Sequence, residues 1–327
     1  MNICVLGGGT WGITLASLLF DNGNSVKIWE FLKDKVEFLK KERKESNLPW
    51  LSIPGSIEIT DNLEFSIWSS ELLVVAIPSW TIRGIFSKIK ENWEDKLIVS
   101  CSKGIEEETF LTPSGVIMDV IKDARVVALS GPSHAEEVSK KIPTAIISAS
   151  CNENDRIFVQ RLFSNNYFRV YTNPDIIGVE LGGGLKNIMA IASGISDGLG
   201  FGDNTKAALF CRGMAEIVRF GILLGGLKET FFGLSGMGDL VVTCISKHSR
   251  NRGFGELIGK GYKKEDAERK INMTIEGIKT TKAVYEYSEK LNIDMPITRE
   301  VYKVIFEGKD PKIACGELLK RQLKEEF

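Results

Sequence analysis

The first half of the chain alternates short apolar runs with segments of helical length. We expect strands at the runs NICVLG, SVKIW, LLVVAIP, LIVSC, RVVALSG, TAIISAS and FRVYTN. These runs are nearly continuous in Val, Ile and Leu, which is typical of strands covered on both faces. The sequence therefore predicts an α/β region built on a doubly wound, mostly parallel sheet.

The pattern changes after Pro174, where apolar residues recur at helical spacing in segments such as IIGVELGGGLKNIMAIASGI and TTKAVYEYSEKLNI. A chain of 327 residues also exceeds the usual size of one domain. We therefore expect an N-terminal domain over residues 1–173 and an all-α C-terminal domain over residues 174–327, with the boundary in the TNPD turn.

A glycine pattern follows the first predicted strand directly. Gly7, Gly9 and Gly12 form G-x-G-x-x-G in VLGGGTWG, at the point where the next helix opens. The first glycine permits a tight turn, the second lets a pyrophosphate approach the backbone, and the third lets the helix pack on the strand. This context favours a dinucleotide site over a glycine-rich turn without a ligand.

The second predicted strand ends at Glu30, eighteen residues after Gly12. A carboxylate there can accept hydrogen bonds from the adenosine ribose and would repel a 2'-phosphate, which favours NAD over NADP. Lys33 and Lys35 follow closely and are able to reach such a phosphate, so NADP remains the alternative. A second alternative is that Glu30 is only a solvated loop charge.

Composition narrows the class of protein. Lys and Arg number 42 against 43 Asp and Glu, so the chain lacks the basic excess expected for binding nucleic acid or anionic membranes. No run reaches the roughly 20 uninterrupted apolar residues of a membrane span. The six cysteines are scattered without a C-x-x-C pair, and the first apolar run is not preceded by a signal-peptide pattern, so we expect a cytoplasmic protein. Two histidines make a metal site or a histidine triad unexpected.

Lys186 lies in an unusual environment for a lysine. If the surrounding segment is helical, Gly182, Gly183, Met189 and Ala190 share its face. An ammonium among such residues loses water that only a polar partner replaces, which points to a ligand or a reacting group. The alternative is a lysine that snorkels at a domain boundary.

A second polar cluster follows in the predicted all-α half. Asp239 and Thr243 would share a helical face, and Ser249, Arg250 and Asn251 lie where a new helix can begin. A serine N-cap with Arg and Asn beside free backbone N–H groups suits a phosphate or a carboxylate.

Taken together, the segments GGGTWG, SCSKGIE, LSGPSHAEEV, GVELGGGLKNIMAIASGISDGLGFGDNTKAAL, GMGDLVVTCISKHSRNRGFG and MTIEGIKT resemble the successive signatures of bacterial NAD(P)-dependent sn-glycerol-3-phosphate dehydrogenases. They occur in family order over nearly the whole chain. The resemblance implies a Rossmann-type N-terminal domain, an all-helical C-terminal domain and an active site between them. It also implies reversible hydride transfer between NAD or NADP and dihydroxyacetone phosphate, giving sn-glycerol 3-phosphate for phospholipid synthesis, and it suggests a homodimer.

The resemblance assigns site residues by motif. Lys186 matches the proton-transferring lysine, and Lys103 matches a lysine shared by substrate and cofactor. The expected substrate positions are Lys103, Gly131, Ser133, Lys186, Asp239, Ser249, Arg250 and Asn251. With Glu30 added from the ribose argument, the expected cofactor positions are Gly7, Gly9, Thr10, Trp11, Gly12, Glu30, Lys103, Ala135, Arg250 and Glu276.

Two residues depart from the family pattern. His134 stands where an aromatic residue is usual, and Glu30 stands where many members carry arginine, which agrees with the ribose argument. For Lys186 to serve as acid and base, burial and the charge of Lys103 should lower its pKa to around 7 to 8, while Asp239 should raise it.

Two other interpretations stay open at the level of sequence. In the first, the chain is a related dehydrogenase of a hydroxy acid, in which Arg250 holds a carboxylate. In the second, it is a catalytically silent nucleotide sensor, although such a sensor would need none of Lys103, Lys186 and Asp239.

Overall fold

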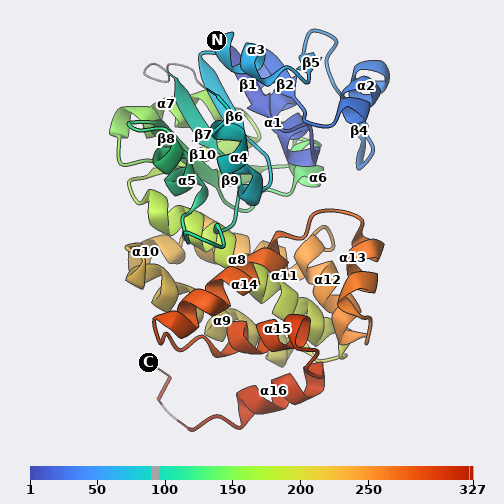
Figure 1. Ribbon diagram of the computed structural model, residues 1–327, viewed down its shortest axis with the longest axis vertical. Coiled ribbons are helices and arrows are strands. Elements are labelled where there is room, and N and C mark those ends of the chain that lie inside the picture. Colours follow the sequence, from blue (N-terminus) through green and yellow to red (C-terminus); the bar gives the residue numbers. More distant parts are fainter. Residues whose placement is uncertain (90–95, 324, 327) are drawn as a thin grey trace.

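The structure is a computed structural model that describes residues 1–89, 96–323 and 325–326. An eight-stranded sheet with helices on its faces forms the N-terminal part, and a bundle of helices forms the C-terminal part (Figure 1). The strands, in spatial order, are β10 (Phe168–Asn173), β9 (Thr144–Ala149), β8 (Arg125–Ser130), β7 (Leu97–Ser100), β6 (Leu72–Val75), β1 (Asn2–Leu6), β2 (Ser25–Trp29) and β5 (Glu58–Thr60).

The described helices agree with the expected change from an α/β part to an all-α part along the chain. Those of the N-terminal part are α1 (Thr10–Asp21), α2 (Lys33–Glu42), α3 (Leu63–Trp68), α4 (Ile82–Phe86), α5 (Pro113–Val120), α6 (Ala135–Val138) and α7 (Glu153–Phe163), with a 3-10 turn η1 (Ser79–Thr81). Those of the C-terminal part are α8 (Ile176–Gly198), α9 (Asp203–Leu223), α10 (Lys228–Phe231), α11 (Asp239–Ile245), α12 (Arg250–Gly259), α13 (Lys264–Ile271), α14 (Glu276–Lys290), α15 (Pro296–Phe306) and α16 (Pro311–Leu319), with a π-helical turn η2 (Leu234–Gly238).

The predicted fold class is confirmed. Each apolar run that predicted a strand contains one, and every pairing in the large sheet is parallel except that of β8 with β9. The connection between those two strands contains only the four-residue α6, which is too short to run back along the sheet as a crossover helix. Beyond the prediction, β5 extends one edge of the sheet, and β3 (Lys44–Glu45) pairs with β4 (Leu48–Ser52) in a separate antiparallel ribbon.

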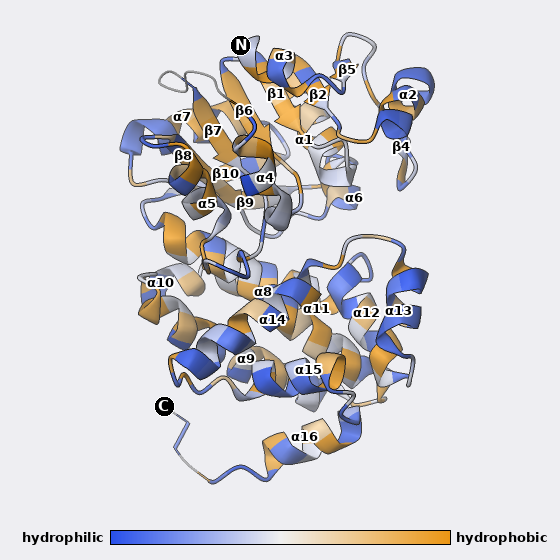
Figure 2. Ribbon diagram, in the orientation of Figure 1, coloured by the Kyte–Doolittle hydropathy of each residue, from blue (hydrophilic) through white to orange (hydrophobic). Residues whose placement is uncertain are grey.

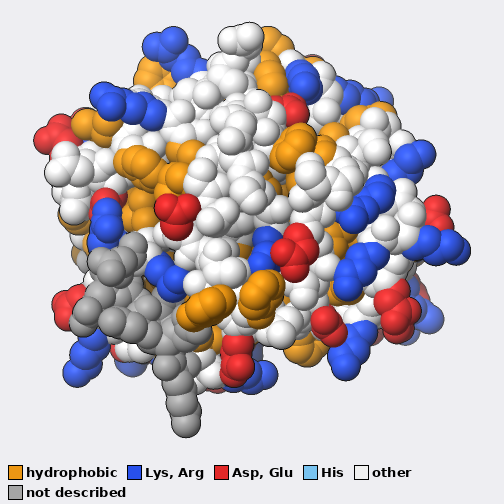
Figure 3. All heavy atoms as spheres, turned by 90° about the horizontal axis from the view of Figure 1, so that it is seen from above, with side chains coloured by type: hydrophobic (Ala, Val, Ile, Leu, Met, Phe, Trp, Pro, Cys, Tyr) orange, Lys and Arg blue, Asp and Glu red, His pale blue; other side chains and the backbone are white. Residues whose placement is uncertain are grey.

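The sheet is buried on both faces, as its continuous apolar runs require. Along β1, Ile3 and Val5 belong to one apolar cluster, while Cys4 and Leu6 belong to another on the opposite face. Hydropathy colouring shows the strands as an apolar centre, whereas peripheral helices such as α2 and α13 are largely polar (Figure 2). Seen from the N-terminal end, basic and acidic side chains are interspersed with apolar ones (Figure 3).

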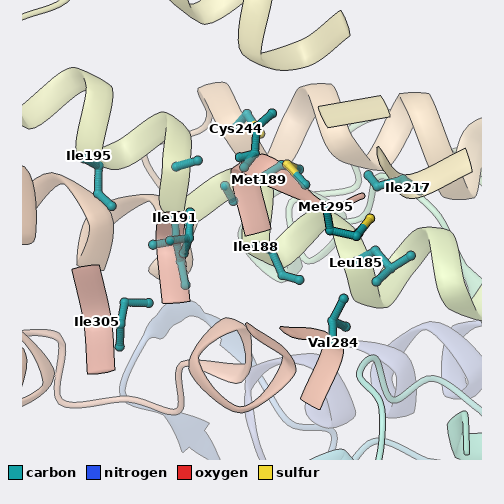
Figure 4. Close-up of a cluster of buried hydrophobic side chains, with 14 of the residues drawn as sticks. Leu185, Ile188, Met189, Ile191, Ile195, Ile217, Cys244, Val284, Met295 and Ile305 are labelled. Atoms are coloured by element: carbon teal, nitrogen blue, oxygen red, sulfur yellow. The ribbon is translucent and has the colours of Figure 1, made fainter. Parts of the chain in front are cut away.

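The C-terminal core is organised around α8. Its side chains pack with residues from neighbouring helices, among them Ile217, Cys244 and Val284 (Figure 4). By length and composition α8 is apolar enough to cross a membrane, but 94% of its most apolar window is buried inside the protein. Its length and apolarity therefore follow from its place at the centre of a helical core.

The connection from the sheet to α8 is short and well capped. The last strand of the sheet ends at Asn173, and α8 begins at Ile176. The Asp175 carboxylate accepts a hydrogen bond from the Gly178 backbone N–H at 2.8 Å, as an N-cap does. This cap fixes the direction in which α8 leaves the sheet.

Candidate active site

The three glycines of the N-terminal loop differ in what surrounds them. Gly7 has φ +116°, a conformation that favours glycine, and a Cβ there would lie 2.5 Å from the Ala76 carbonyl oxygen. A Cβ on Gly12 would overlap the carbonyl oxygen of Gly7, so the helix packs tightly on the turn. A Cβ on Gly9 would meet nothing within 4 Å. Gly9 is also the N-cap of α1 and makes no side-chain cap bond, so this loop fits a pyrophosphate placed against free backbone N–H groups.

Glu30 is held in place beside this loop. It is buried, and its Oε2 accepts a hydrogen bond from the Gly8 backbone N–H at 3.1 Å. Its Oε1 accepts one from the Leu32 N–H at 3.1 Å, and the Lys35 Nζ lies 3.5 Å from Oε2. The interpretation of Glu30 as a solvated loop charge is therefore wrong, because its carboxylate is fixed against the glycine loop.

Four other expected cofactor positions occupy the starts of helices. Thr10 and Trp11 open α1, Ala135 opens α6, and Glu276 opens α14. Burial raises the pKa of the Glu276 carboxyl, and the charges of Arg250, Lys103 and Lys186 oppose that rise. The structure therefore brings Glu276 near the three cations that the sequence assigns to the site.

A cluster of buried charges lies where the two parts of the chain meet. Lys186 on α8 donates to the Asp239 Oδ1 and, at 2.7 Å, to the Thr243 Oγ1. Lys103, on the segment after β7, donates to the Asp239 Oδ2 at 2.6 Å. One carboxylate at the start of α11 thus holds two lysines that lie 83 residues apart in the chain. Lys186 and Asp239 are 6% and 1% exposed, which removes both charges from bulk water.

Burial perturbs the ionisation of these groups. It lowers the pKa of Lys186 to about 8, with Asp239 opposing the change and Lys103 adding to it. The two lysines lower the pKa of the Asp239 carboxyl against the effect of its own burial. Lys186 is therefore poised to exchange a proton near neutral pH, within the range expected from its sequence environment.

The glycines around Lys186 make room for protein rather than for a ligand. A Cβ on Gly182 would lie 2.9 Å from the Ser235 carbonyl oxygen, and one on Gly183 would lie 2.6 Å from the Ser130 Oγ. Because Gly182 and Gly183 have no side chains, α8 can approach both the end of β8 and the π-helical turn η2.

Gly131 lies against the ammonium end of the Lys103 side chain, and Ser133 contacts Gly131. Gly131 has φ +147°, and its carbonyl oxygen accepts hydrogen bonds from the Lys103 Nζ at 3.2 Å and from the Ser133 Oγ at 3.0 Å. The turn after β8 therefore orients the lysine that Asp239 binds.

The three residues expected to bind an anion, Ser249, Arg250 and Asn251, lie at the start of a helix, as predicted. Ser249 is the N-cap of α12 and accepts a hydrogen bond from a first-turn backbone N–H at 3.2 Å, while Arg250 is exposed. Asn251 makes a bridge: its Nδ2 donates to the Asn187 Oδ1, and its Oδ1 accepts from the Gly277 N–H, each at 2.9 Å. Asn251 thereby ties α12 to α8 and α14.

Three polar residues near the site were not among the expected site positions. Thr243 binds the Lys186 ammonium, and its spacing of four from Asp239 on a helix is a sequence signal for that contact. Asn187 follows Lys186 directly, and its buried Nδ2 has no partner among the described residues. His134 lies 6.0 Å from His248 between ring centroids, and burial lowers its pKa to about 4, so it is neutral at pH 7.

The part of the chain that the structure describes contains no group of three or more His, Cys, Asp or Glu side chains arranged to hold a metal ion. A buried ammonium such as that of Lys186 is a group that can donate or accept a proton, and the exposed Arg250 at the start of α12 is a group that can bind an anion.

Two full-length relatives and one closely similar crystal structure are all described as glycerol-3-phosphate dehydrogenases. A glycerol-3-phosphate dehydrogenase (NAD(P)+) of Clostridium botulinum is 49% identical over 327 residues, which covers 99% of each chain. Its namesake from Fusobacterium nucleatum is 45% identical over 331 residues, which covers 100% of this chain and 99% of the relative. The crystal structure of glycerol-3-phosphate dehydrogenase from Coxiella burnetii has a TM-score of 0.93 at 36% identity and covers 98% of this chain and 99% of its own.

Two family models match the chain in succession. The model of the N-terminus of NAD-dependent glycerol-3-phosphate dehydrogenase matches residues 2–156, and the model of its C-terminus matches residues 175–315. Since models and relatives agree over almost the whole length, this chain belongs to the NAD-dependent glycerol-3-phosphate dehydrogenase family.

Proposed function

We propose that Lys186 transfers the proton in the reaction of this enzyme, an NAD(P)-dependent dehydrogenase that interconverts dihydroxyacetone phosphate and sn-glycerol 3-phosphate. The observation that carries the proposal is the buried cluster in which Asp239 holds Lys186 and Lys103. Reducing a ketone requires a proton donor beside the oxygen on which negative charge develops. Lys186 is a buried donor whose pKa is lowered to about 8, close to working pH.

The bound nicotinamide supplies or accepts the hydride, and the chain's own residues handle charge and position. In the reductive direction, the Lys186 ammonium gives a proton to the developing alkoxide and returns to the neutral amine. Asp239 fixes the direction of that ammonium, and the Lys103 ammonium stabilises negative charge nearby. In the oxidative direction, the neutral amine accepts the proton.

A pKa of about 8 divides the two directions unequally. At pH 7, roughly nine in ten Lys186 side chains would carry the proton that reduction consumes. The residue is thus better prepared for making sn-glycerol 3-phosphate than for oxidising it, which suits a supply of this product for phospholipid synthesis. A glycerol-requiring mutant strain that grows without glycerol when given this gene would support that role, and continued dependence would contradict it.

For the substrate phosphate we propose a seat at the start of α12. Arg250 supplies a cation and the α12 N-terminus supplies backbone N–H groups, as recognition of an anion requires. The exposure of Arg250 leaves its guanidinium accessible to a ligand. We assign the other expected substrate contacts to Gly131, Ser133, Ser249 and Asn251.

For the cofactor we propose a preference for NAD. The support is Glu30, whose fixed carboxylate lies beside the glycine loop where it would repel a 2'-phosphate. The nearby Lys35 offsets part of this charge, so we expect a preference rather than an exclusion.

Lys186→Met tests the central assignment. Methionine keeps the length and apolar contacts of the side chain but cannot carry a proton, so kcat should fall by about 10²- to 10⁴-fold. The KM for NADH should change less than about twofold, because the nucleotide loop is untouched. The matched control is Lys206→Met, which breaks another lysine–aspartate pair, with Asp197, outside the proposed site. Turnover like that of the wild type in Lys186→Met would eliminate Lys186 from the chemistry.

Three further assignments belong to this proposal. Residues 1–173 and 174–327 are taken as the two domains, and limited proteolysis near residue 174 would test the division.

A homodimer is proposed because large apolar residues around the end of α9 and α10, including Leu223 and Phe232, are exposed. Sedimentation as a monomer at micromolar concentration would contradict the homodimer.

A cytoplasmic location fits six free cysteines, and recovery of the protein outside the cytoplasm would exclude it.

A further inference from the structure

The segment that carries Lys103 lies in the N-terminal part of the chain but contacts the helices of the C-terminal part. It runs from the end of β7 to the start of α5. Within it, Ile105 is buried in the same apolar cluster as the helices of the C-terminal part. Phe110 stacks on Tyr287 of α14 with ring centroids 4.2 Å apart. The position of Lys103 therefore depends on how this segment docks against the helices.

A buried carboxylate on α8 holds the end of that segment. Glu180 is 4% exposed, and its Oε1 accepts a hydrogen bond from the Ser114 backbone N–H at 3.0 Å. Its Oε2 accepts one from the Ser114 Oγ at 2.5 Å. Ser114 lies in the first turn of α5, whose N-cap, Thr112, makes no side-chain cap bond. Glu180 thus caps α5 from a helix of the other part of the chain.

Stability alone is a poor explanation for this carboxylate. Burial raises the pKa of Glu180 to about 7, and hydrogen bonds from Ser114 and Thr112 oppose the rise. Among the described residues, no cation contributes to that balance. A buried acid without a cation is costly, and a helix N-terminus can be capped more cheaply by a local Ser, Thr, Asp or Asn.

What distinguishes Glu180 is the pair of elements that it joins. Lys186 follows it on α8 by six residues, about 9 Å along the helix. Ser114 follows Lys103 by eleven residues at the far end of the docked segment. We infer that Glu180 is a positioning residue: it locks α8 to the start of α5 and so keeps the ammonium groups of Lys186 and Lys103 on the two oxygens of Asp239. The inference rests on the proposed roles of these lysines.

Close packing between α8 and the segment that carries Lys103 makes the contact between Glu180 and Ser114 effective in fixing their relative position. A Cβ on Gly184 would lie 3.4 Å from the backbone of Gly104, next to Lys103, so α8 and the docked segment are already in close contact. In such a seam a shift of one element against the other changes the distances from Asp239 to both lysines. A misplacement of about 1 Å between reacting groups can cost about 100-fold in rate.

The chain contains a matched control for Glu180. Glu216 on α9 is 2% exposed, and its carboxylate accepts hydrogen bonds from the Ile297 and Thr298 backbone N–H groups at the start of α15. Burial raises its pKa to about 7 as well. The two carboxylates share burial and a capping role, but the hydrogen bonds of Glu216 among the described residues join α9 to the start of α15, both in the C-terminal part.

The experiment compares leucine and glutamine at the two positions. Glu180→Leu should lower kcat for reduction of dihydroxyacetone phosphate by about tenfold or more, while the KM for NADH changes less than about twofold. Glu180→Gln should return kcat to within about threefold of the wild type, because its amide oxygen can accept from the Ser114 N–H and its NH₂ can donate to the hydroxyl. Glu216→Leu should lower the Tm but leave kcat within about twofold.

Either of two results would overturn the inference: kcat within twofold of the wild type in Glu180→Leu, or an equal loss of kcat in Glu216→Leu. If Glu180→Leu does not fold, Ser114→Ala decides, because it removes one donor to Glu180 and leaves the N–H; a drop in kcat supports the lock, and an unchanged kcat contradicts it. Lys186→Met is measured alongside. An active Lys186→Met enzyme would contradict the proposed role of Lys186 in proton transfer. An inactive Lys186→Met enzyme together with an active Glu180→Leu enzyme would contradict only the positioning role of Glu180.

Discussion

The glycine loop around Gly9, proposed to bind the nucleotide, and the buried charge cluster around Lys186, proposed to transfer the proton, are built from different kinds of chemical group. The loop presents backbone N–H groups at the start of α1, with open space in front of Gly9. The cluster presents side-chain charges that are almost fully buried, and it draws them from α8, α11 and the segment after β7. Backbone N–H groups cost little to hold in place, whereas buried charges are stable only as long as each keeps its partners.

This difference teaches where each region is sensitive. At Gly9, an added side chain meets open space, so it should block a ligand without disturbing the fold. At the cluster, a change in one residue alters the ionisation of its neighbours, because Asp239 and Lys103 act on the pKa of Lys186, and both lysines act on the pKa of Asp239. We therefore expect steric substitutions to separate binding from folding at the loop, and charge substitutions to separate chemistry from binding at the cluster.

Gly9→Val should have the largest effect at the nucleotide loop. Gly9 has an extended backbone conformation that valine can adopt, so the Tm should stay close to that of the wild type. The added side chain would occupy the place of the pyrophosphate, and the KM for NADH should rise by at least about tenfold. Steady-state kinetics and thermal unfolding measure the two quantities.

Gly12→Ala is the control, since its Cβ would overlap the Gly7 carbonyl oxygen and should lower the Tm by itself. If Gly9→Val bound NADH as the wild type does, the pyrophosphate would not contact this loop.

Arg250→Gln should have an intermediate effect, and only on the substrate. Removing one charge-assisted contact costs about 1.5–3 kcal/mol, which corresponds to a rise of about 10- to 100-fold in the KM for dihydroxyacetone phosphate. The KM for NADH should change much less. Arg269→Gln, an exposed arginine paired with Asp266 on α13, serves as control. An unchanged substrate KM would mean that the phosphate binds elsewhere.

Glu30→Gln should have the smallest effect and should change cofactor choice rather than activity. The amide keeps the size of the side chain but loses the charge that repels a 2'-phosphate, so the ratio of kcat/KM for NADH to that for NADPH should fall by a few-fold. A wild-type enzyme that already prefers NADPH would overturn the assignment.

The fold could be predicted from local pattern to the extent that apolar runs mark buried strands. The strands β3 and β5 were missed because they are short and contain polar residues such as Lys44, Glu45 and Glu58. The antiparallel pairing of β9 depends on the length of α6, which apolar periodicity does not report.

The site divides in the same way. The loop from Gly7 to Gly12 is contiguous, so the tight turn at Gly7 and the close packing at Gly12 could be predicted from spacing alone. The contact of Lys186 with Asp239 joins residues 53 apart, and nothing local to either predicts it. The family resemblance placed both in one site, but Glu180 and Asn187 lay outside its motif assignments.

The measurement that tests the central claim most directly is the pH dependence of kcat in both directions. On the proposed mechanism, reduction consumes the protonated form of Lys186, whose pKa is lowered to about 8, so kcat for reduction should fall as pH rises through about 8. Under the same conditions, kcat for oxidation of sn-glycerol 3-phosphate should rise through the same midpoint, because that direction needs the neutral amine. Profiles that are flat in both directions between pH 7 and 9.5 would contradict proton transfer by Lys186.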